Sequence, residues 1–476
     1  MSKAMINMSY FALALIINKS ISLLMLPVIP HFLAPAQMGK LELLTSFNVV
    51  VALVVCFALN EALFRFVGTE KRTNVQLKLR NNIYTLTVSI SFITALALFA
   101  MLSLVPLPTE FMLLELIVII LCISLEGSIG IGTAWLRMKD DKAKTLFTMM
   151  VSTTLLQVIF IITALNASPS VLSVLLGGLV ASSIQFVWLH LINRYHFAFP
   201  SKEQIYTFLR YSTPIMLAGL MAFCLNGAER WFIGANASLE TLGVYAIAAK
   251  FALGMCILVQ PFGMWWMPRR FAFLEEGNTN TAIRITHLGV VYIAALTTLV
   301  ATLAYIIIHT LLPETYHDAF LYTLFLLPIA MLKEWYELLN LPILYKKHTN
   351  KLLLINACSA SLAVLLLFSL NNIGIWGVFI ALYIAQIAKL VMTLFVGKSC
   401  IKMRFNINLL VVMHLLSGIG LVLVHSSPST FIAMLCCIVM CFVYFLIAKN
   451  YMTKKQRKAV NDQVQKWHIQ LSRSLQ

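Results

Sequence analysis

Long apolar runs dominate the chain and are separated by short polar segments. Each run is long enough for an α-helix to cross a hydrocarbon core of roughly 30 Å. The runs show no period-two alternation and are about twice the length of a strand in a membrane β-barrel. We therefore predict an all-α polytopic membrane protein with about fourteen transmembrane helices, at residues 10–33, 43–64, 83–105, 112–136, 146–166, 170–192, 211–234, 242–266, 287–309, 319–345, 352–370, 375–397, 407–425 and 429–448.

Composition supports this prediction and excludes a soluble globular protein. Of the 476 residues, 60% are hydrophobic and only 11% are charged. The net charge of +17 does not indicate a nucleic-acid partner, because the basic residues follow the predicted topology. With a cytoplasmic N-terminus, 29 of the 35 basic residues lie in cytoplasmic segments or at their edges, whereas six of the alternate loops contain none. We predict a multi-pass protein of a plasma membrane with both termini in the cytoplasm.

A weak internal repeat predicts two bundles of helices. Residues 33–66 can be aligned with residues 236–271 at an offset of 204, which places Gly39 opposite Gly243 and Arg65 opposite Arg269. Each copy is predicted to contain, in order, a short outer loop, a glycine, a long apolar helix and a basic inner end. We predict the domains as an N-terminal six-helix bundle at 1–193, a cytoplasmic linker at 194–210, a second six-helix bundle at 211–397, two additional helices at 398–448 and a basic tail at 449–476.

Five basic residues fall inside predicted spans, where a charge is costly unless it has a partner or faces water. They are Lys19, Arg230, Lys250, Lys333 and Lys389. One interpretation pairs Arg230 with Glu229 or Glu240, and Lys333 with Glu337. Lys19, Lys250 and Lys389 have no acid within their own helices, so we expect them to line a wet cavity. Fixed positive charges in a cavity attract an anion, and the ligand is therefore predicted to be anionic.

Glu126 is the candidate for coupling to an ion gradient. It lies near the middle of a predicted span, in the stretch SLEGSIGIGTAW, where Gly127, Gly130 and Gly132 are expected to loosen the helix. A carboxylate in this position suits a proton or a cation. The alternative interpretation makes Glu126 a counter-ion to Lys19.

The sequence shows no sign of a catalytic centre, a metal site or a cofactor. Its nine cysteines form no CxxC pair, and no HExxH, GxSxG or paired-carboxylate pattern is present. Glycan polymerases and ligases usually carry a large outer loop for catalytic groups. No predicted outer loop here exceeds about nine residues, so we do not expect an enzyme.

A set of features recurs along residues 208–271. It begins with Tyr211 and Pro214 at the start of a span and the acid–arginine pair Glu229–Arg230. It continues with Gly234, with Leu242-Gly243-Val244-Tyr245 leading to Lys250, and with Trp266 and Pro268 at the inner end. These features resemble the Wzx-type polysaccharide flippases of the multidrug/oligosaccharidyl-lipid/polysaccharide exporter superfamily, where the pair is more often Asp-Arg. The stretch FLAPAQMGKLELL is similar to the family's first loop.

The resemblance implies a flippase that moves undecaprenyl-diphosphate-linked oligosaccharide, for O-antigen, capsule or a related glycan, across the bacterial inner membrane by alternating access. It implies that Lys19, Arg230, Lys250 and Lys389 bind the anionic, lipid-linked substrate, and it is compatible with glycan polymerases as partners. Two alternatives belong to the same superfamily. A multidrug antiporter tends to have an acid in its first span, where this chain has Lys19. A lipid II flippase is expected to have Ser-Arg and Arg-Asp motifs that the N-terminus lacks.

Overall fold

The computed structural model describes residue 17 and residues 25–104, 110–139, 142–267, 269–401 and 403–452. Lys19, most of the predicted first span and most of the basic tail lie outside these residues. The described chain is helical and contains no β-strand. Its elements are η1 (Ile29–His31), α2 (Pro35–Cys56), α3 (Leu59–Ala62), η2 (Leu63–Val67), α4 (Thr73–Leu104), α5 (Leu113–Arg137), α6 (Ala143–Ala167), α7 (Val171–Asn193), α8 (Lys202–Asn226), α9 (Glu229–Asn236), α10 (Leu239–Trp266), α11 (Arg270–Glu275), α12 (Thr279–Leu311), η4 (Glu314–Tyr316), α13 (Ala319–Leu339), α14 (Leu341–Tyr345), α15 (Thr349–Ser369), η5 (Asn371–Ile373), α16 (Ile375–Cys400), α17 (Ile407–His425) and α18 (Thr430–Tyr451).

Thirteen helical segments of the described chain are long and apolar enough to cross a membrane. They coincide with the thirteen predicted spans that follow the first one. The prediction of an all-α polytopic membrane protein is therefore confirmed. Large apolar side chains remain exposed along these helices, for example Phe395 at 78% and Phe431 at 74%, as expected for surfaces that contact lipid rather than water.

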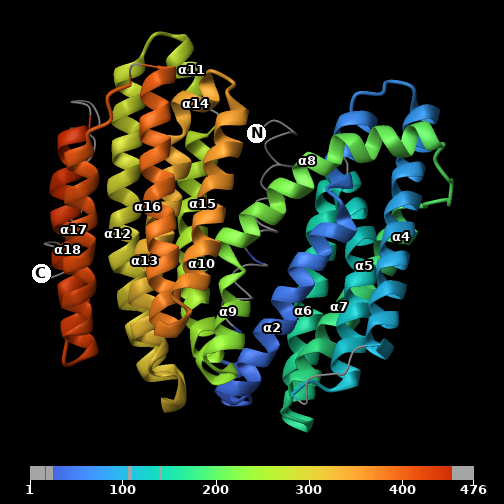
Figure 1. The fold of residues 1–476 in the computed structure, drawn as a ribbon, viewed down its shortest axis with the longest axis horizontal. Coiled ribbons are helices and arrows are strands. Elements are labelled where there is room, and N and C mark those ends of the chain that lie inside the picture. The colour runs from blue at the N-terminus through green and yellow to red at the C-terminus, as the bar shows by residue number, and fades with distance from the viewer. Residues whose placement is uncertain are drawn as a thin grey trace, which may run out of the picture. The chain divides into compact units, whose positions relative to one another are not determined.

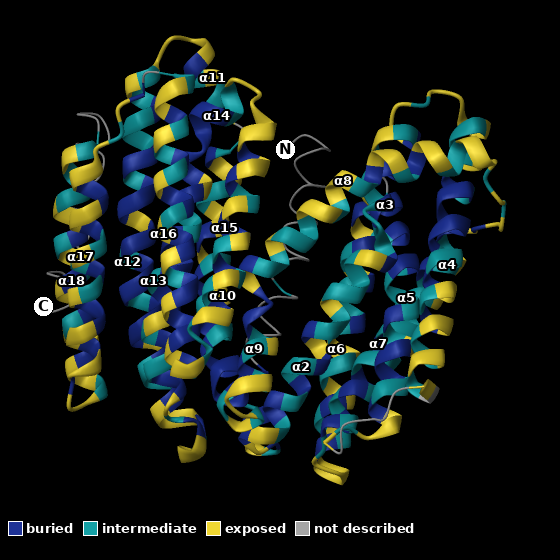
Figure 2. Cartoon of the chain, in the orientation of Figure 1, coloured by how far each residue is buried: buried dark blue, intermediate teal, exposed yellow. Residues whose placement is uncertain are grey.

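The chain divides into two compact units. Unit 1 comprises Met1–Ile247, Leu312–Tyr316 and Ala363–Val378, and unit 2 comprises Ala248–Leu311, His317–Leu362 and Phe379–Gln476. In unit 1, helix α5 packs against α2, α4 and α7, and α6 packs against α7 (Figure 1). In unit 2, helix α12 packs against α13, α17 and α18. Figure 2 shows α12 with long buried stretches, whereas α17 and α18 carry many exposed positions.

Glycines on α5 permit close packing and do not break the helix. A Cβ on Gly127 would lie 2.7 Å from side-chain atoms of Ser91 and Thr87 on α4, and a Cβ on Gly132 would lie 3.1 Å from Leu189 on α7. Helix α5 runs without interruption from Leu113 to Arg137. Gly127 and Gly132 therefore let neighbouring helices approach α5 closely, and the expected loosening of the helix stays a prediction.

The span that contains α2 is broken at its inner half. Phe57 and Ala58 adopt the left-handed backbone conformation, with φ of 44° and 50°. They separate α2 from the short helix α3, and η2 continues the segment to Val67. Ser212 on α8 donates a hydrogen bond to the carbonyl oxygen of Ala58 at 3.3 Å. The backbone N–H of Glu61 donates to the same carbonyl oxygen at 3.0 Å, so the Ser212 hydroxyl adds a second hydrogen bond that ties α8 to the break.

Helix α8 continues the predicted linker directly into a membrane span. Ser201 caps its N-terminus by accepting a hydrogen bond from the backbone N–H of Gln204, whose side chain in turn accepts from the N–H of Ser201. This capping box fixes where the helix begins. Pro214 lies inside α8, and Figure 1 shows the helix changing direction along its length. Proline accounts for such a bend because it removes one backbone hydrogen bond and clashes with the preceding turn.

Candidate functional site

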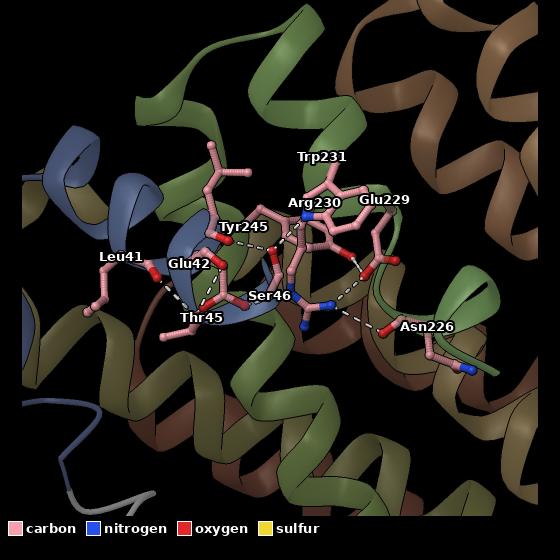
Figure 3. Close-up of polar contacts among 10 residues, drawn as sticks. Leu41, Glu42, Thr45, Ser46, Asn226, Glu229, Arg230, Trp231 and Tyr245 are labelled. Atoms are coloured by element: carbon pink, nitrogen blue, oxygen red, sulfur yellow. Dashed lines mark hydrogen bonds and ion pairs between the residues drawn. The ribbon is translucent and has the colours of Figure 1, made fainter. Parts of the chain in front are cut away.

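An arginine and two glutamates from distant parts of the sequence meet in unit 1 (Figure 3). Nε of Arg230 lies 2.5 Å from Oε1 of Glu42 on α2, and its Nη1 lies 3.0 Å from Oε1 of Glu229. Nη1 also donates to the carbonyl oxygen of Asn226 at 3.2 Å. One guanidinium therefore serves two carboxylates, and the trio carries a net negative charge when both are ionised. The pairing with Glu229 is one of the two interpretations left open for Arg230, whereas nothing in the sequence indicates Glu42.

Two aromatic residues complete this site. The hydroxyl of Tyr245 on α10 donates to Oε1 of Glu229 at 3.1 Å, and Nε1 of Trp231 donates to the Ser46 hydroxyl at 2.9 Å. Glu229 is only 3% exposed, and within the described chain its Oε2 atom has no hydrogen-bond partner. We call these residues the Arg230 cluster: Glu42, Ser46, Glu229, Arg230, Trp231 and Tyr245.

Two glycines allow α2 and α10 to touch beside the Arg230 cluster. A Cβ on Gly39 would lie 1.8 Å from the carbonyl oxygen of Leu239, and a Cβ on Gly243 would lie 1.9 Å from that of Pro35. Every other residue type carries a Cβ, so this approach of the two backbones requires glycine on both helices. The internal repeat aligns the same two glycines. Their equivalence was thus visible in the sequence, but their contact was not.

A second ion pair lies where α2 and α5 begin. Nζ of Lys40 is 2.7 Å from Oε2 of Glu115, and both side chains are largely buried. With a cytoplasmic N-terminus, Lys40 stands at the outer end of its helix, where the other predicted helix ends carry no lysine or arginine. Its charge is balanced by this carboxylate, which stabilises a group that the apolar surroundings would otherwise disfavour.

Lys389 lies in unit 2 on helix α16 and is 7% exposed. Its Nζ is 3.8 Å from the ring centroid of Tyr336 on α13, a cation–π contact. Among the described residues no carboxylate oxygen lies within 4.0 Å of Nζ, although Glu337 and Lys333 interact with it electrostatically. Gln386, one turn earlier, is 1% exposed, and both of its side-chain polar atoms are without a hydrogen-bond partner in the described chain.

The other intramembrane candidates occupy separate places. Lys250 is half-buried on α10 in unit 2, and Lys19 lies outside the described residues. Lys333 forms no ion pair within 4.0 Å among the described residues, and Glu337 instead accepts a hydrogen bond from the Asn340 amide at 3.3 Å. Glu126 is half-buried on α5, with the Asn48 side chain of α2 beside it.

Basic residues are also built into the helix ends that the topology places in the cytoplasm. In unit 1, the Arg80 guanidinium lies 5.0 Å from the Trp135 ring and 4.8 Å from the Tyr195 ring, and it donates to the carbonyl oxygen of Asn193 at 3.1 Å. Burial raises the pKa of the Tyr195 phenol, and the charge of Arg80 opposes that shift. In unit 2, burial lowers the pKa of Arg270, and Glu337 partly offsets this effect. These arginines hold loops in place and were not recognised as structural residues from the sequence.

The chain matches one protein family in sequence, and its fold is similar to the folds of solved membrane proteins. Residues 5–273 match the family model described as polysaccharide biosynthesis protein. The fold resembles the lipid II flippase MurJ in an inward closed conformation, at 13% identity over 93% of this chain and 98% of that chain, with a TM-score of 0.69. It also resembles the inward-facing conformation of a multidrug resistance MATE family transporter of the MOP superfamily, at 14% identity over 80% and 94%, with a TM-score of 0.60.

No curated protein sequence matches the chain. The family match covers more than half of its residues, and it includes the whole stretch 208–271 on which the predicted resemblance rests. The structural similarities extend the shared fold over most of the remaining chain. The resemblance predicted from the sequence is confirmed, and the chain belongs to the polysaccharide biosynthesis protein family.

Proposed function

We propose that this protein is a flippase that moves lipid-linked oligosaccharide from the cytoplasmic to the periplasmic leaflet of the bacterial inner membrane. The observation that carries the proposal is the match of residues 5–273 to the polysaccharide biosynthesis family. The fold shared with a lipid II flippase supports a transporter of this general kind. The cargo would be an undecaprenyl-diphosphate-linked unit for O-antigen, capsule or another surface glycan, and a glycan polymerase would use the product.

Cations inside the membrane-spanning helices support an anionic cargo. Lys389 is the best-supported site among the described residues, because its ammonium group is buried against an aromatic ring with no carboxylate within 4.0 Å. A diphosphate would supply a negative charge in direct contact with Nζ. We propose Lys19 and Lys250 as further contacts. Arg230 is already engaged by two carboxylates, so it would meet the cargo only after the Arg230 cluster has opened.

Transport by alternating access needs a source of energy, and we propose Glu126 as the group that couples it to an ion gradient. A half-buried carboxylate beside a polar amide binds and releases a proton or a cation more readily than one in a fixed ion pair. The two-bundle organisation predicted from the repeat, with both termini in the cytoplasm, belongs to the same proposal.

Leaflet-resolved transport in proteoliposomes tests this function. Purified protein is reconstituted with lipid-linked oligosaccharide, and the fraction that reaches the opposite leaflet is measured over time. Lys389→Ala, Lys250→Ala and Lys19→Ala are compared with the corresponding Arg variants, which keep the charge. Loss of one charged contact to a phosphate is expected to slow transport by about tenfold or more, and arginine should restore part of the rate.

Lys78→Ala provides the control, because Lys78 is an exposed lysine on α4. It should leave transport unchanged. Thermal unfolding of every variant separates a lost contact from a lost fold. Wild-type rates in all three alanine variants would remove these lysines from the mechanism. Absence of any transport by the correctly folded wild-type protein, with lipid-linked oligosaccharides of several compositions, would overturn the proposed function.

A further inference from the structure

A surplus of positive charge lies among the helices of unit 2. Lys389 on α16 interacts electrostatically with Glu337 and Lys333 of α13. Glu337 also interacts with Arg270 on α11, and Lys333 interacts with Glu334. Three cations therefore share two carboxylates, and the group carries a net charge of +1 when every member is ionised. A charge inside a membrane-spanning region is costly unless it is balanced or hydrated.

The surplus charge is concentrated at Lys389. This residue is only 7% exposed, whereas Glu337 is open to solvent. Arg270 is also buried, but it donates to the carbonyl oxygen of Glu337 at 3.2 Å and to Oδ1 of Asn340 at 3.4 Å. Within the part of the chain that the structure describes, Nζ of Lys389 has no carboxylate within 4.0 Å and lies against the ring of Tyr336. An aromatic ring replaces only part of the hydration that a buried cation has lost.

A buried amide lies on the same face of α16. Gln386 precedes Lys389 by three residues, a spacing that places two side chains on one side of a helix. It is 1% exposed, and neither its Nε2 nor its Oε1 atom has a hydrogen-bond partner in the described chain. Buried polar atoms are almost always hydrogen-bonded, and each exception needs an explanation. The amide of Gln386 and the ammonium group of Lys389 therefore both lack an acceptor.

The aromatic ring beside Lys389 is held in place by side chains from two helices. The Tyr336 side chain interacts with those of Asn340 on the same segment and Asn356 on α15. Asn340 in turn donates to Oε2 of Glu337 at 3.3 Å. These contacts keep Tyr336 and Glu337 engaged with amides. The unsatisfied donors of α16 are therefore left to a partner that the chain itself does not supply.

We propose that unit 2 binds a chloride ion between Lys389 and Gln386. Nζ and Nε2 would donate to the ion, and Oε1 of Gln386 would accept from the ammonium group at the three-residue spacing. A monovalent anion matches the surplus of one positive charge. Phosphate or sulfate would bring more charge and more bulk than two residues at 7% and 1% exposure can accept.

The chloride site follows from charge and burial within unit 2 and does not depend on the transport proposed above. One consequence does rest on that proposed function. The phosphate of the cargo and chloride would compete for Lys389, so chloride should raise the cargo concentration that gives half-maximal transport.

Binding of radioactive chloride to the purified full-length protein tests the site without any cargo. The protein is kept in detergent with gluconate as the main anion, and bound chloride is measured by scintillation proximity. Lys389→Met should weaken chloride binding by about tenfold or more, because a hydrogen bond to a charged group contributes at least that factor. Gln386→Met keeps the charge and should weaken binding by about fivefold. Bromide should compete with chloride, whereas sulfate should not.

Two further variants separate a specific site from general charge. Lys398→Met removes the same charge from an exposed position on the same helix, and its affinity for chloride should stay within about twofold of the wild-type value. Lys389→Arg keeps the charge and should bind more tightly than Lys389→Met. Gln386→Met tests the site even if Lys389→Met fails to fold.

Thermal unfolding gives a second measurement. At constant ionic strength, chloride should raise the unfolding temperature of the wild-type protein above its value in gluconate, because a ligand that binds only the folded state stabilises it. The same effect should appear in Lys398→Met and be absent from Lys389→Met.

Anomalous scattering from crystals grown in bromide locates the ion, and a peak beside Nζ of Lys389 and Nε2 of Gln386 is expected. Three results would overturn the proposal: no saturable chloride binding by the folded wild-type protein, an equal loss of affinity in Lys398→Met, or a water molecule in place of the halide. Chloride binding by a protein that moves no lipid-linked oligosaccharide would support the site while it overturned the proposed function.

Discussion

At the scale of single residues, the charges inside unit 1 are arranged as balanced groups. Arg230 bridges Glu42 and Glu229, and Lys40 pairs with Glu115. Removing one member of a buried ion pair costs more than the pair itself contributes, because the remaining charge keeps its desolvation penalty. The effect should be largest for Arg230, because two carboxylates depend on its charge.

Substitution of Arg230 by glutamine is therefore expected to lower the free energy of unfolding by about 3 kcal/mol or more. Glu229, at 3% exposure, would be left as a buried carboxylate without its cation. The double variant Glu229→Gln/Arg230→Gln should recover part of this loss, because it removes the stranded charge. Thermal or denaturant unfolding in detergent measures both. Equal stability of the single and double variants would show that the carboxylate is adequately solvated.

The partners of the charged residues were only partly predictable from the sequence. Glu229 is adjacent to Arg230, so their pairing could be anticipated from spacing. Glu42 is 188 positions away, and nothing in a single sequence indicates such a partner. The same reason hid the pairing of Lys40 with Glu115. Lys389 was correctly located within a helix, but its contact with Tyr336 depends on how α16 packs against α13.

At the scale of helices, hydropathy identified every described span, because twenty apolar residues have few alternatives to a membrane helix. It did not identify where helices break or touch. Phe57 and Ala58 interrupt a run that is apolar throughout. Nor did it identify the close helix contacts at Gly127 and Gly132 on α5. Both features depend on neighbouring helices and are therefore invisible to a pattern along one helix.

The contact between α2 and α10 is expected to tolerate no side chain at its two glycines. Gly39→Ala or Gly243→Ala would place a Cβ within 2 Å of a backbone oxygen, which forces the helices apart and should cost about 1–3 kcal/mol. Gly263→Ala on α10 is the control, because no atom lies within 4 Å of its added Cβ. It should be neutral or slightly stabilising. Similar unfolding midpoints for all three variants would argue against the close approach.

At the break between α2 and α3, a substitution to glycine is expected to stabilise the protein. Ala58 has a left-handed backbone conformation, which costs an L-residue roughly 1–2 kcal/mol and costs glycine little. Ala58→Gly should therefore raise the free energy of unfolding by up to about 1 kcal/mol after the entropy of glycine is subtracted. Ala62→Gly, within the adjacent regular helix α3, should lower it. A destabilising effect of both substitutions would show that the break is not left-handed.

At the scale of the whole molecule, the distribution of charge gives a prediction about orientation. The thirteen described spans and the predicted first span make an even number, so both termini should lie on one side. Lysine and arginine near span ends favour the cytoplasm, and the basic ends described above should face it. Alkaline phosphatase fused after residue 476 should therefore be inactive, and a fluorescent protein at that position should fold and fluoresce.

A matched fusion within the connection at Asn371–Ile373 tests the opposite side of the membrane. Residues 371–374 contain no lysine or arginine, and they connect α15 to α16. Alkaline phosphatase inserted there should be active, because the enzyme needs an oxidising compartment to form its disulfides. Activity at both positions would mean that the number of spans between them is even. One of the helices α16, α17 and α18 would then not cross the membrane, and the charge bias would fail to predict the side on which the basic C-terminal segment lies.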